Sequence, residues 1–257
     1  MKIPENLFKK AVCSGVPQVG VWSSLADPAA AELCAGSGFD WMLIDGEHSP
    51  NDLRTVLVQL QAAAPYPTSV LVRPPLGTAV LVKQFLDIGA QSLLIPMVDT
   101  AEHARQMARA VCYPPQGVRG VAGQTRAGRW GRVPDYFVGA REQICLIVQI
   151  ESTAGLENVD AIAGVDGIDA LFVGPADLAA SMGHLGQPSH PDVVRAIAHV
   201  HERAKVHEKP VGILTLDANL AQQCIDDGFG FVGVGMDTML LAQSLTALRG
   251  RFATRES

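Results

Sequence analysis

Charged side chains follow abruptly on an apolar run in the stretch FDWMLIDGEHSPND. Residues Trp41–Ile44 have the composition of a core strand, and Asp45, Glu47 and His48 come directly after them. Carboxylates can hold a hard cation or orient water, and an imidazole with a pKa of about 6.5 can transfer protons near neutral pH. This combination at a strand end predicts a catalytic or metal-binding turn.

Two later apolar runs end in polar residues as well. SVLVRPP ends in Arg73, which could face a developing oxyanion or form a buried ion pair with a nearby acid. CLIVQIES carries Gln149 and ends in Glu151. Polar groups at several strand ends indicate a shared site.

The run ALFVGPADL adds a fourth polar end, with Gly174, Ala176 and Asp177. Glu151 and Asp177 are hard oxygen ligands on adjacent predicted strands, and they suit Mg²⁺ or Mn²⁺. Each could instead be an acid stabilised at a helix N-terminus, but the pair favours a metal. Backbone N–H groups of Gly174-Pro175-Ala176 at a helix start could bind a carboxylate or phosphate.

Lysine is missing from these strand ends, although a Schiff-base mechanism requires a desolvated lysine. The chain has Lys2, Lys9, Lys10, Lys83, Lys205 and Lys209. Carbanion chemistry would therefore depend on a metal acting as Lewis acid. Among the histidines, only His48 follows a predicted strand. Four are expected at the surface of helices: His103, His199, His201 and His207. The roles of His184 and His190, in a loop, stay open.

The elements that must position these residues alternate along the chain. The predicted strands are Val19–Trp22, Trp41–Asp45, Ser69–Arg73, Ser92–Pro96, Ile144–Ile150, Ala170–Val173, Val211–Leu214 and Phe231–Val234. Helical patterns separate most of them, which favours a parallel sheet covered on both faces. Eight such units predict a (β/α)8 barrel, whose active site lies at the C-terminal strand ends. A doubly wound open sheet is the alternative, but no GxGxxG or Walker motif supports its nucleotide-binding forms.

Three segments stand out between the strands. The stretch Asn51–Ala64 has apolar residues at i, i+3, i+4 and i+7, and Asn51 is its predicted N-cap. The connection from residue 113 to 141 is long and rich in Gly, Pro and Arg, so it is either functional, interfacial or a solubilising surface loop. An apolar helix over Asp237–Leu248 is expected to pack in an oligomer, followed by a polar tail.

Composition limits the classes of function. The length of 257 residues predicts one domain spanning 1–257. The hydrophobic content of 48% and the mean hydropathy of +0.19 indicate extra buried surface, such as a subunit interface. A net charge of −6 without a dense Lys/Arg run makes nucleic acid an improbable partner. Five scattered cysteines without CxxC, no apolar N-terminal region and no membrane-spanning run predict a cytoplasmic protein.

Several motifs, in order, resemble the HpcH/HpaI aldolase family, from about Gly20 to Leu248. They are WMLIDGEHSPND, VRPP, FLDIGAQSLLIPMV, YPPQGVRG, VQIES and LFVGPADLAASMG. The family consists of class II, metal-dependent pyruvate aldolases. The DGEH form and APYP at 64–67 are most similar to 4-hydroxy-2-oxoheptanedioate aldolases of aromatic compound catabolism.

The resemblance implies roles for the matching residues. The general base would be His48, and Arg73 would steady a pyruvate enolate. A divalent ion (Mg²⁺, Mn²⁺ or Co²⁺) would bind Glu151 and Asp177. Substrate contacts would come from Trp22, Gln149 and the backbone of Gly174, Ala176 and Asp177.

Two further acids and the assembly are also implied. Asp45 would orient water at the metal, and Asp87, in FLDIGA, would raise the basicity of the histidine. Asp87 lies near a helix C-terminus, where a negative charge opposes the helix dipole, so we expect it to have a cationic or donor partner. The family forms hexamers, which would explain the apolar surplus.

The expected reaction is cleavage of a 4-hydroxy-2-oxo acid to pyruvate and an aldehyde. One alternative is a CoA-thioester lyase of the citrate lyase beta or malyl-CoA lyase type. Its CoA phosphates would need a basic patch, for which the candidates are Arg119, Arg126, Arg129 and Arg132. Another is a different 2-keto-3-deoxy sugar acid aldolase of the same family. A non-catalytic oligomer would be favoured by a lost base or ligand, but none of these is missing.

Overall fold

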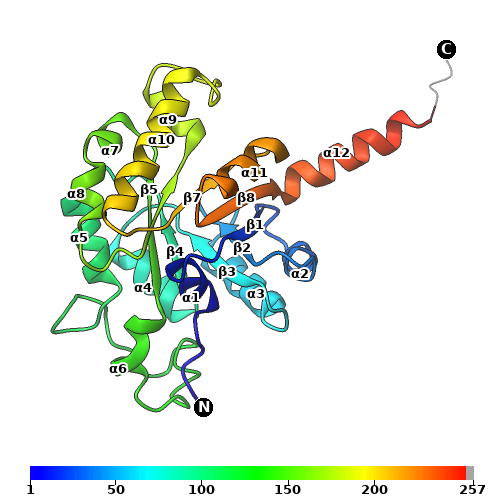
Figure 1. Cartoon of the computed structure of the whole chain (residues 1–257). Helices are drawn as coiled ribbons and strands as arrows, with labels where there is room; N and C mark the ends of the chain where they lie inside the picture. Colours follow the sequence, from blue (N-terminus) through cyan, green and yellow to red (C-terminus); the bar gives the residue numbers. More distant parts are fainter. Residues whose placement is uncertain (253–257) are drawn as a thin grey trace.

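Eight parallel strands close into a barrel in the computed structural model, which describes residues 1–252 (Figure 1). Neighbours in sequence pair with one another, and the last strand pairs with the first. The strands are β1 (Gln18–Ser23), β2 (Trp41–Asp45), β3 (Ser69–Arg73), β4 (Ser92–Ile95), β5 (Cys145–Ile150), β6 (Ala170–Val173), β7 (Val211–Leu214) and β8 (Phe231–Met236). The predicted (β/α)8 barrel is confirmed, and every predicted strand lies within one or two residues of its observed bounds.

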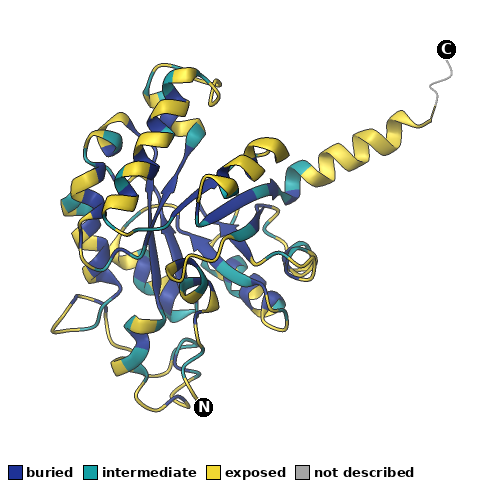
Figure 2. Ribbon diagram, in the orientation of Figure 1, coloured by how far each residue is buried: buried dark blue, intermediate teal, exposed yellow. Residues whose placement is uncertain are grey.

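Most of the helices cover the outside of the barrel and turn their buried faces towards the strands, whereas α1 lies at one end of the barrel and α12 projects from it (Figure 2). They are α1 (Leu7–Cys13), α2 (Pro28–Ala35), α3 (Leu53–Ala63), α4 (Ala79–Asp87), α5 (Ala101–Ala110), α6 (Tyr136–Gly139), α7 (Thr153–Glu157), α8 (Val159–Ala163), α9 (Pro175–Ser181), α10 (Pro191–Val206), α11 (Ala218–Asp226) and α12 (Asp237–Gly250), with a 3₁₀ turn at Ala140–Gln143. Within residues 1–252, none of the helices has the length and apolarity to cross a membrane.

Aromatic side chains fill the inside of the barrel. Trp41 and Phe231 point inward, and Phe8 from α1 packs edge-on against both, with ring centroids 6.2 and 5.2 Å away. Gly20 and Gly212 leave room for these rings, because a Cβ at either position would overlap Trp41 or Phe231. The N-terminal helix thus closes the barrel at the end where the strands begin.

The start of α3 differs from the prediction by one residue. Asp52, not Asn51, is the N-cap, and its carboxylate accepts hydrogen bonds from the amides of Arg54 and Thr55 at 3.0 and 2.8 Å. Asn51 instead donates its side-chain amide to the carbonyl of Asp45 at 2.8 Å. Both residue types can cap a helix, so the sequence alone did not separate them.

The expectation that His201 lies on the surface is wrong. His201 is buried, and its ring stacks on Phe229 with centroids 4.1 Å apart. Its Nε2 lies 3.3 Å from the carbonyl oxygen of Gly228. The ring covers the edge of the core where α10 meets the turn before β8. The apolar faces of the imidazole therefore pack against the core although histidine is a polar residue.

The last helix, α12, leaves the barrel and projects away from it (Figure 1). Asp237 is its one buried residue, the next two residues are half-buried, and the helix is exposed from Leu240 on (Figure 2). Its apolar side chains are therefore uncovered in the single chain: Leu240, Leu241, Leu245 and Leu248. The polar tail predicted after the helix lies, from residue 253 on, outside the described residues.

Candidate active site

The polar residues predicted at the strand ends do converge at one end of the barrel. They are contributed by β2, β3, β5 and the turn from β6 into α9. Arg73 contacts Asp45 and Glu47 in the turn after β2, and the charge of Glu151 also stabilises the charged form of its guanidinium. Because all strands are parallel, their C-terminal ends must meet on one face, and the barrel brings these side chains there.

A two-pronged ion pair anchors the site. Arg73, which is 6% exposed, donates from Nε and Nη2 to the two carboxylate oxygens of Asp45, at 2.9 and 2.7 Å. Its Nη1 lies 3.0 Å from Oε2 of Glu47. Burial alone would raise the pKa of Asp45, but the hydrogen bonds and charge of Arg73 outweigh it and lower that pKa. Burial likewise opposes the charge on Arg73, yet Asp45, Glu47 and Glu151 together raise the pKa of the guanidinium.

The turn after β2 is built around Asp45. The amides of Glu47 and His48 donate to its Oδ1 at 3.0 and 3.4 Å, an arrangement that aspartate favours in turns. The amide of Gly46 donates to the carbonyl of Arg73 at 2.7 Å. A Cβ at Gly46 would approach that same carbonyl oxygen to 2.7 Å, so the close passage of the two strand ends requires glycine.

Glu151 is the most perturbed acid in the site. Burial, with the negative charges of Glu47 and Asp177, raises the pKa of Glu151 to about 7, against the opposing effects of the Met97 amide and the charge of Arg73. Met97 N–H donates to Oε1 at 2.7 Å, and Gln149 donates its side-chain amide to Oε2 at 2.5 Å. Burial also raises the pKa of Glu47, despite Arg73. We call Glu47, Glu151 and Asp177 the carboxylate cluster.

The turn from β6 into α9 completes the cluster. Asp177 lies in the first turn of α9 with its side chain exposed to solvent. Gly174 contributes space rather than an N–H: its amide donates to the carbonyl of Ile150 at 3.2 Å, and a Cβ there would lie 2.5 Å from Glu151 Oε2. The predicted amide cradle is therefore reduced to Ala176 and Asp177, because the Gly174 amide is used by β5 and proline has none.

Comparison with known proteins places the chain in a family. The model of the HpcH/HpaI aldolase/citrate lyase family matches residues 18–244. The chain belongs to this family. It is 54% identical over 253 residues to a hydroxypyruvate/pyruvate aldolase from Pseudomonas aeruginosa, covering 98% of this chain and 94% of that one. It is 48% identical over 252 residues to a 4-hydroxy-2-oxo-heptane-1,7-dioate aldolase from Escherichia coli, covering 98% and 96%.

Comparison with solved structures supports the same family. A crystal structure of an HpcH/HpaI aldolase/citrate lyase family protein from Burkholderia cenocepacia matches with a TM-score of 0.92 and 42% identity, covering 95% of this chain and 98% of that one. The resemblance in the sequence is thus confirmed, and the protein is a carbon–carbon lyase of the pyruvate aldolase type.

Two of the residues predicted for catalysis in this aldolase lie apart from each other. His48 stands at the rim, 63% exposed, with Nε2 3.9 Å from Glu47 Oε2. Asp87 ends α4, just before β4 begins, so it lies at the opposite end of the barrel. Its expected cationic partner is Arg119, whose Nη2 lies 2.9 Å from Oδ1. Within one chain, the aldolase does not bring Asp87 to His48.

Two polar atoms in the buried floor of the site have neither a hydrogen-bond nor an ion-pair partner among the described residues. They are Nε1 of Trp22 and Oε1 of Gln149. The Trp22 ring lies beneath Arg73, with the guanidinium carbon 5.6 Å from a ring centroid. A donor and an acceptor left free in a buried floor are suited to a polar ligand, because leaving them unpaired is costly.

Met97 is a feature of the site that the sequence analysis missed. It follows β4, has a backbone φ of +52°, and presents its N–H to Glu151. A left-handed backbone at a non-glycine residue is strained and occurs often at functional sites. A signal existed, because Pro96-Met97 directly follows β4 at the same end of the barrel as the other polar strand ends, but both side chains are apolar and do not mark a site.

Proposed function

We propose that this aldolase reversibly cleaves 4-hydroxy-2-oxo acids into pyruvate and an aldehyde, with Mg²⁺, Mn²⁺ or Co²⁺ held by Glu151 and Asp177. The observation that carries the proposal is the convergence of a buried guanidinium, Arg73, on the carboxylate cluster. The named relatives share pyruvate chemistry but differ in the second substrate. 4-Hydroxy-2-oxoheptanedioate, with succinate semialdehyde as its aldehyde, is therefore one proposed substrate.

The residues of the carboxylate cluster fit a divalent cation. Burial, together with the negative charges of Glu47 and Asp177, raises the pKa of Glu151, and a bound cation would offset these effects. Glu151 and Asp177 offer oxygen ligands, and Gly174 leaves space beside them. The unpaired Oε1 of Gln149 points to a further polar occupant. When bound, the ion would supply Lewis-acid polarisation of the substrate's 2-oxo group.

Arg73 would stabilise charge that develops on pyruvate. A guanidinium has five N–H donors. Two bind Asp45, and a third faces Glu47. The remaining donors are held in a fixed, buried orientation by these acids and are available to an oxyanion. Such preorganised donors stabilise the enolate without having to reorganise during the reaction.

His48 is the proposed base. Its exposed position at the rim leaves the imidazole open to a substrate that enters from solvent. It would remove the proton from the 4-hydroxyl group as the C3–C4 bond breaks, so the aldehyde forms and the bonding electrons pass to the pyruvate enolate. The protonated His48 would then return this proton to C3, which gives pyruvate and restores the base. Asp45, held by Arg73, keeps the His48 turn in place through its carboxylate.

Any role for Asp87 requires a second copy of the chain. Asp87 lies at the opposite end of the barrel from His48, so it can act on a histidine only in a neighbouring subunit. The uncovered leucines of α12 support an oligomer, and the family resemblance suggests a hexamer.

We further propose that the whole chain works as one domain and is cytoplasmic.

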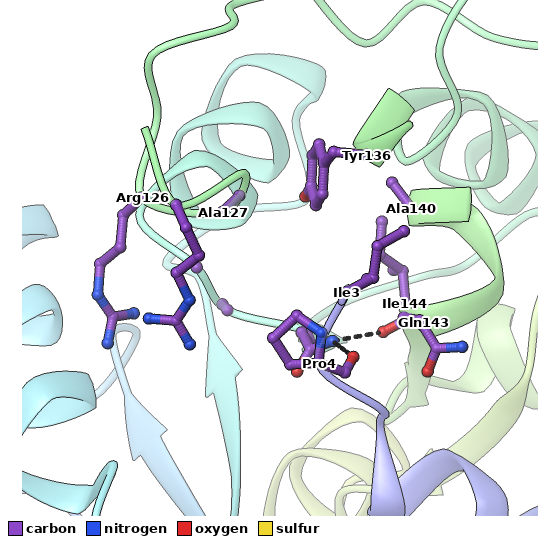
Figure 3. Close-up of a pocket in the computed structure, with 12 residues that line it drawn as sticks. Ile3, Pro4, Arg126, Ala127, Tyr136, Ala140, Gln143 and Ile144 are labelled. Carbon is purple, nitrogen blue, oxygen red and sulfur yellow. Dashed lines mark hydrogen bonds between the residues drawn. The ribbon is translucent and has the colours of Figure 1, made fainter. Parts of the chain in front are cut away.

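The CoA-thioester alternative is disfavoured by where the arginines lie. Arg126 and Arg129 line a pocket with Gln91 and Ile144, which immediately precede β4 and β5 (Figure 3). This pocket is at the opposite end of the barrel from the carboxylate cluster. Arg119 is buried and paired with Asp87. These arginines therefore do not form a phosphate-binding patch at the mouth of the site.

The direct test is pyruvate release from a panel of 4-hydroxy-2-oxo acids, before and after removal of metal. We expect cleavage to stop on chelation and to return with Mg²⁺, Mn²⁺ or Co²⁺. Full turnover by protein that elemental analysis shows to be metal-free would contradict the proposal.

A further inference from the structure

A second group of ligating side chains lies outside the carboxylate cluster. His184 and His190 lie in the loop between α9 and α10, which projects at the top of Figure 1, and Asp192 lies in the first turn of α10. Each offers one ligand atom, and these atoms all lie within 4.8 Å of one another. The reaction proposed above uses none of the three.

The backbone holds these residues together. The amide of His184 donates to the carbonyl of Ala179 at 2.8 Å, the amide of Gln187 to the carbonyl of His184 at 2.9 Å, and the amide of His190 to the carbonyl of Gln187 at 3.0 Å. His190 then caps α10, with Nδ1 3.2 Å from the amide of Asp192. The two imidazoles are stacked, with centroids 3.6 Å apart and planes inclined by 15°.

The carboxylate of Asp192 divides its oxygens between two tasks. Oδ1 forms an ion pair with Arg195. Oδ2 lies 3.3 Å from Nε2 of His184 and 3.7 Å from Nδ1 of His190. One oxygen therefore lies near both ring nitrogens, so the three candidate ligand atoms lie together.

The spacing suits a tetrahedral transition-metal ion. Metal–nitrogen and metal–oxygen bonds of about 2.0–2.1 Å place tetrahedral ligands about 3.3–3.4 Å apart. Both imidazoles must turn about χ2 to direct their lone pairs at one point, and this torsion has broad, shallow minima. Binding through Nδ1 of His190 would replace the hydrogen bond that this nitrogen accepts from the amide of Asp192.

We propose that His184, His190 and Asp192 form a second metal site, selective for Zn²⁺ or a similar first-row ion. Two nitrogens and one oxygen suit such ions, whereas the all-oxygen carboxylate cluster suits Mg²⁺ or Mn²⁺. The ion ties the loop after α9 to the start of α10. Since α9 carries Asp177 in its first turn, the ion stiffens the segment that positions this carboxylate without touching substrate.

The test is Zn²⁺ binding to untagged, metal-free full-length protein in a Glu151→Gln/Asp177→Asn background, which silences the carboxylate cluster. Calorimetry should show one equivalent bound. His184→Ala should weaken binding by at least the about 10–100-fold that follows loss of a supporting metal-site residue. His199→Ala, an exposed histidine on the same helix α10, is the matched control and should bind as the background does.

A second variant and a spectroscopic probe guard against misfolding. Asp192→Asn keeps the shape of the side chain and should also weaken Zn²⁺ binding, while circular dichroism without metal stays unchanged. Co²⁺ added to the same background should give the intense visible bands of a tetrahedral nitrogen-ligated ion, and these should disappear in His184→Ala. Equal Zn²⁺ affinity in His184→Ala, Asp192→Asn and His199→Ala, or no Zn²⁺ binding in the background, would overturn the proposal.

Discussion

Gly174→Ala tests whether the space beside Glu151 matters. The new Cβ would lie 2.5 Å from Glu151 Oε2 and 2.7 Å from Gln149 Nε2. Ordinary contact begins near 3.4 Å, so the carboxylate must move by up to about 0.9 Å. A displacement of about 1 Å at a reacting centre can cost about 10²-fold in rate. We expect kcat to fall about 10²-fold and Mn²⁺ affinity to fall about 10–100-fold, as for other disturbed metal sites.

The assay measures Mn²⁺ affinity by calorimetry and pyruvate release at saturating metal. Gly123→Ala is the matched control, because a Cβ there meets nothing within 4 Å. It should leave both quantities unchanged. A folded Gly174→Ala protein with the affinity and kcat of the parent would refute the reasoning that the glycine keeps the metal ligand in place.

Three other predictions concern charge, pH and packing. Arg73→Lys should lower kcat about 10²–10³-fold, because a single ammonium cannot bind both oxygens of Asp45 and still face the enolate; parent-like turnover would show that charge alone suffices. Mg²⁺ affinity should rise with pH and level off above about 7, because below that pH the raised pKa keeps Glu151 protonated in the metal-free protein and binding must release the proton. Calorimetry in buffers of different ionisation enthalpy measures the released proton, and pH-independent binding would contradict the role of Glu151 as a metal ligand. Phe8→Ala should reduce the free energy of unfolding by about 3–5 kcal/mol in urea titrations, because it empties the closed end of the barrel; a loss under about 1 kcal/mol would mean that α1 is dispensable.

The strands were the most predictable part of the chain. Runs such as Trp41–Asp45 and Cys145–Ile150 are buried on both faces, so apolar composition marks them directly. The end of each strand then fixed which polar residues would meet. Parallel strands in a barrel leave no other choice, which is why Asp45, Arg73 and Glu151 were brought together as predicted.

Hydrogen-bond partners could not be predicted in the same way. Which of Asn51 and Asp52 caps α3, and whether Gly174 has a free amide, depend on the approach of a neighbouring strand. The burial of His201 depends on where Phe229 packs. These outcomes are set by tertiary contacts between segments distant in sequence, and local patterns carry no record of them.

The position of Asp87 shows a different limit. The motif FLDIGA suggested a role beside His48, yet the fold places the two residues at opposite ends of one barrel. One sequence does not indicate which residues of two subunits lie close together, so a role of Asp87 in a neighbouring subunit could not be predicted from it. The prediction that Asp87 has a cationic partner, drawn from the helix dipole, is confirmed, whereas the identity of that partner, Arg119, is set by a tertiary contact.

Formation of a pyruvate enolate is the step on which the proposed reaction depends. The most direct measurement is the exchange of the methyl protons of pyruvate with D₂O, followed by NMR. The protein is loaded with Mg²⁺ and contains no Mn²⁺, and no aldehyde is added. We predict rapid exchange by the parent protein, loss of exchange in Glu151→Gln, and slowing of about 10²–10⁴-fold in His48→Ala, as for a lost general base. No exchange by the parent protein with Mg²⁺ bound, or exchange at the parent rate in Glu151→Gln, would show that this site does not form a metal-stabilised pyruvate enolate.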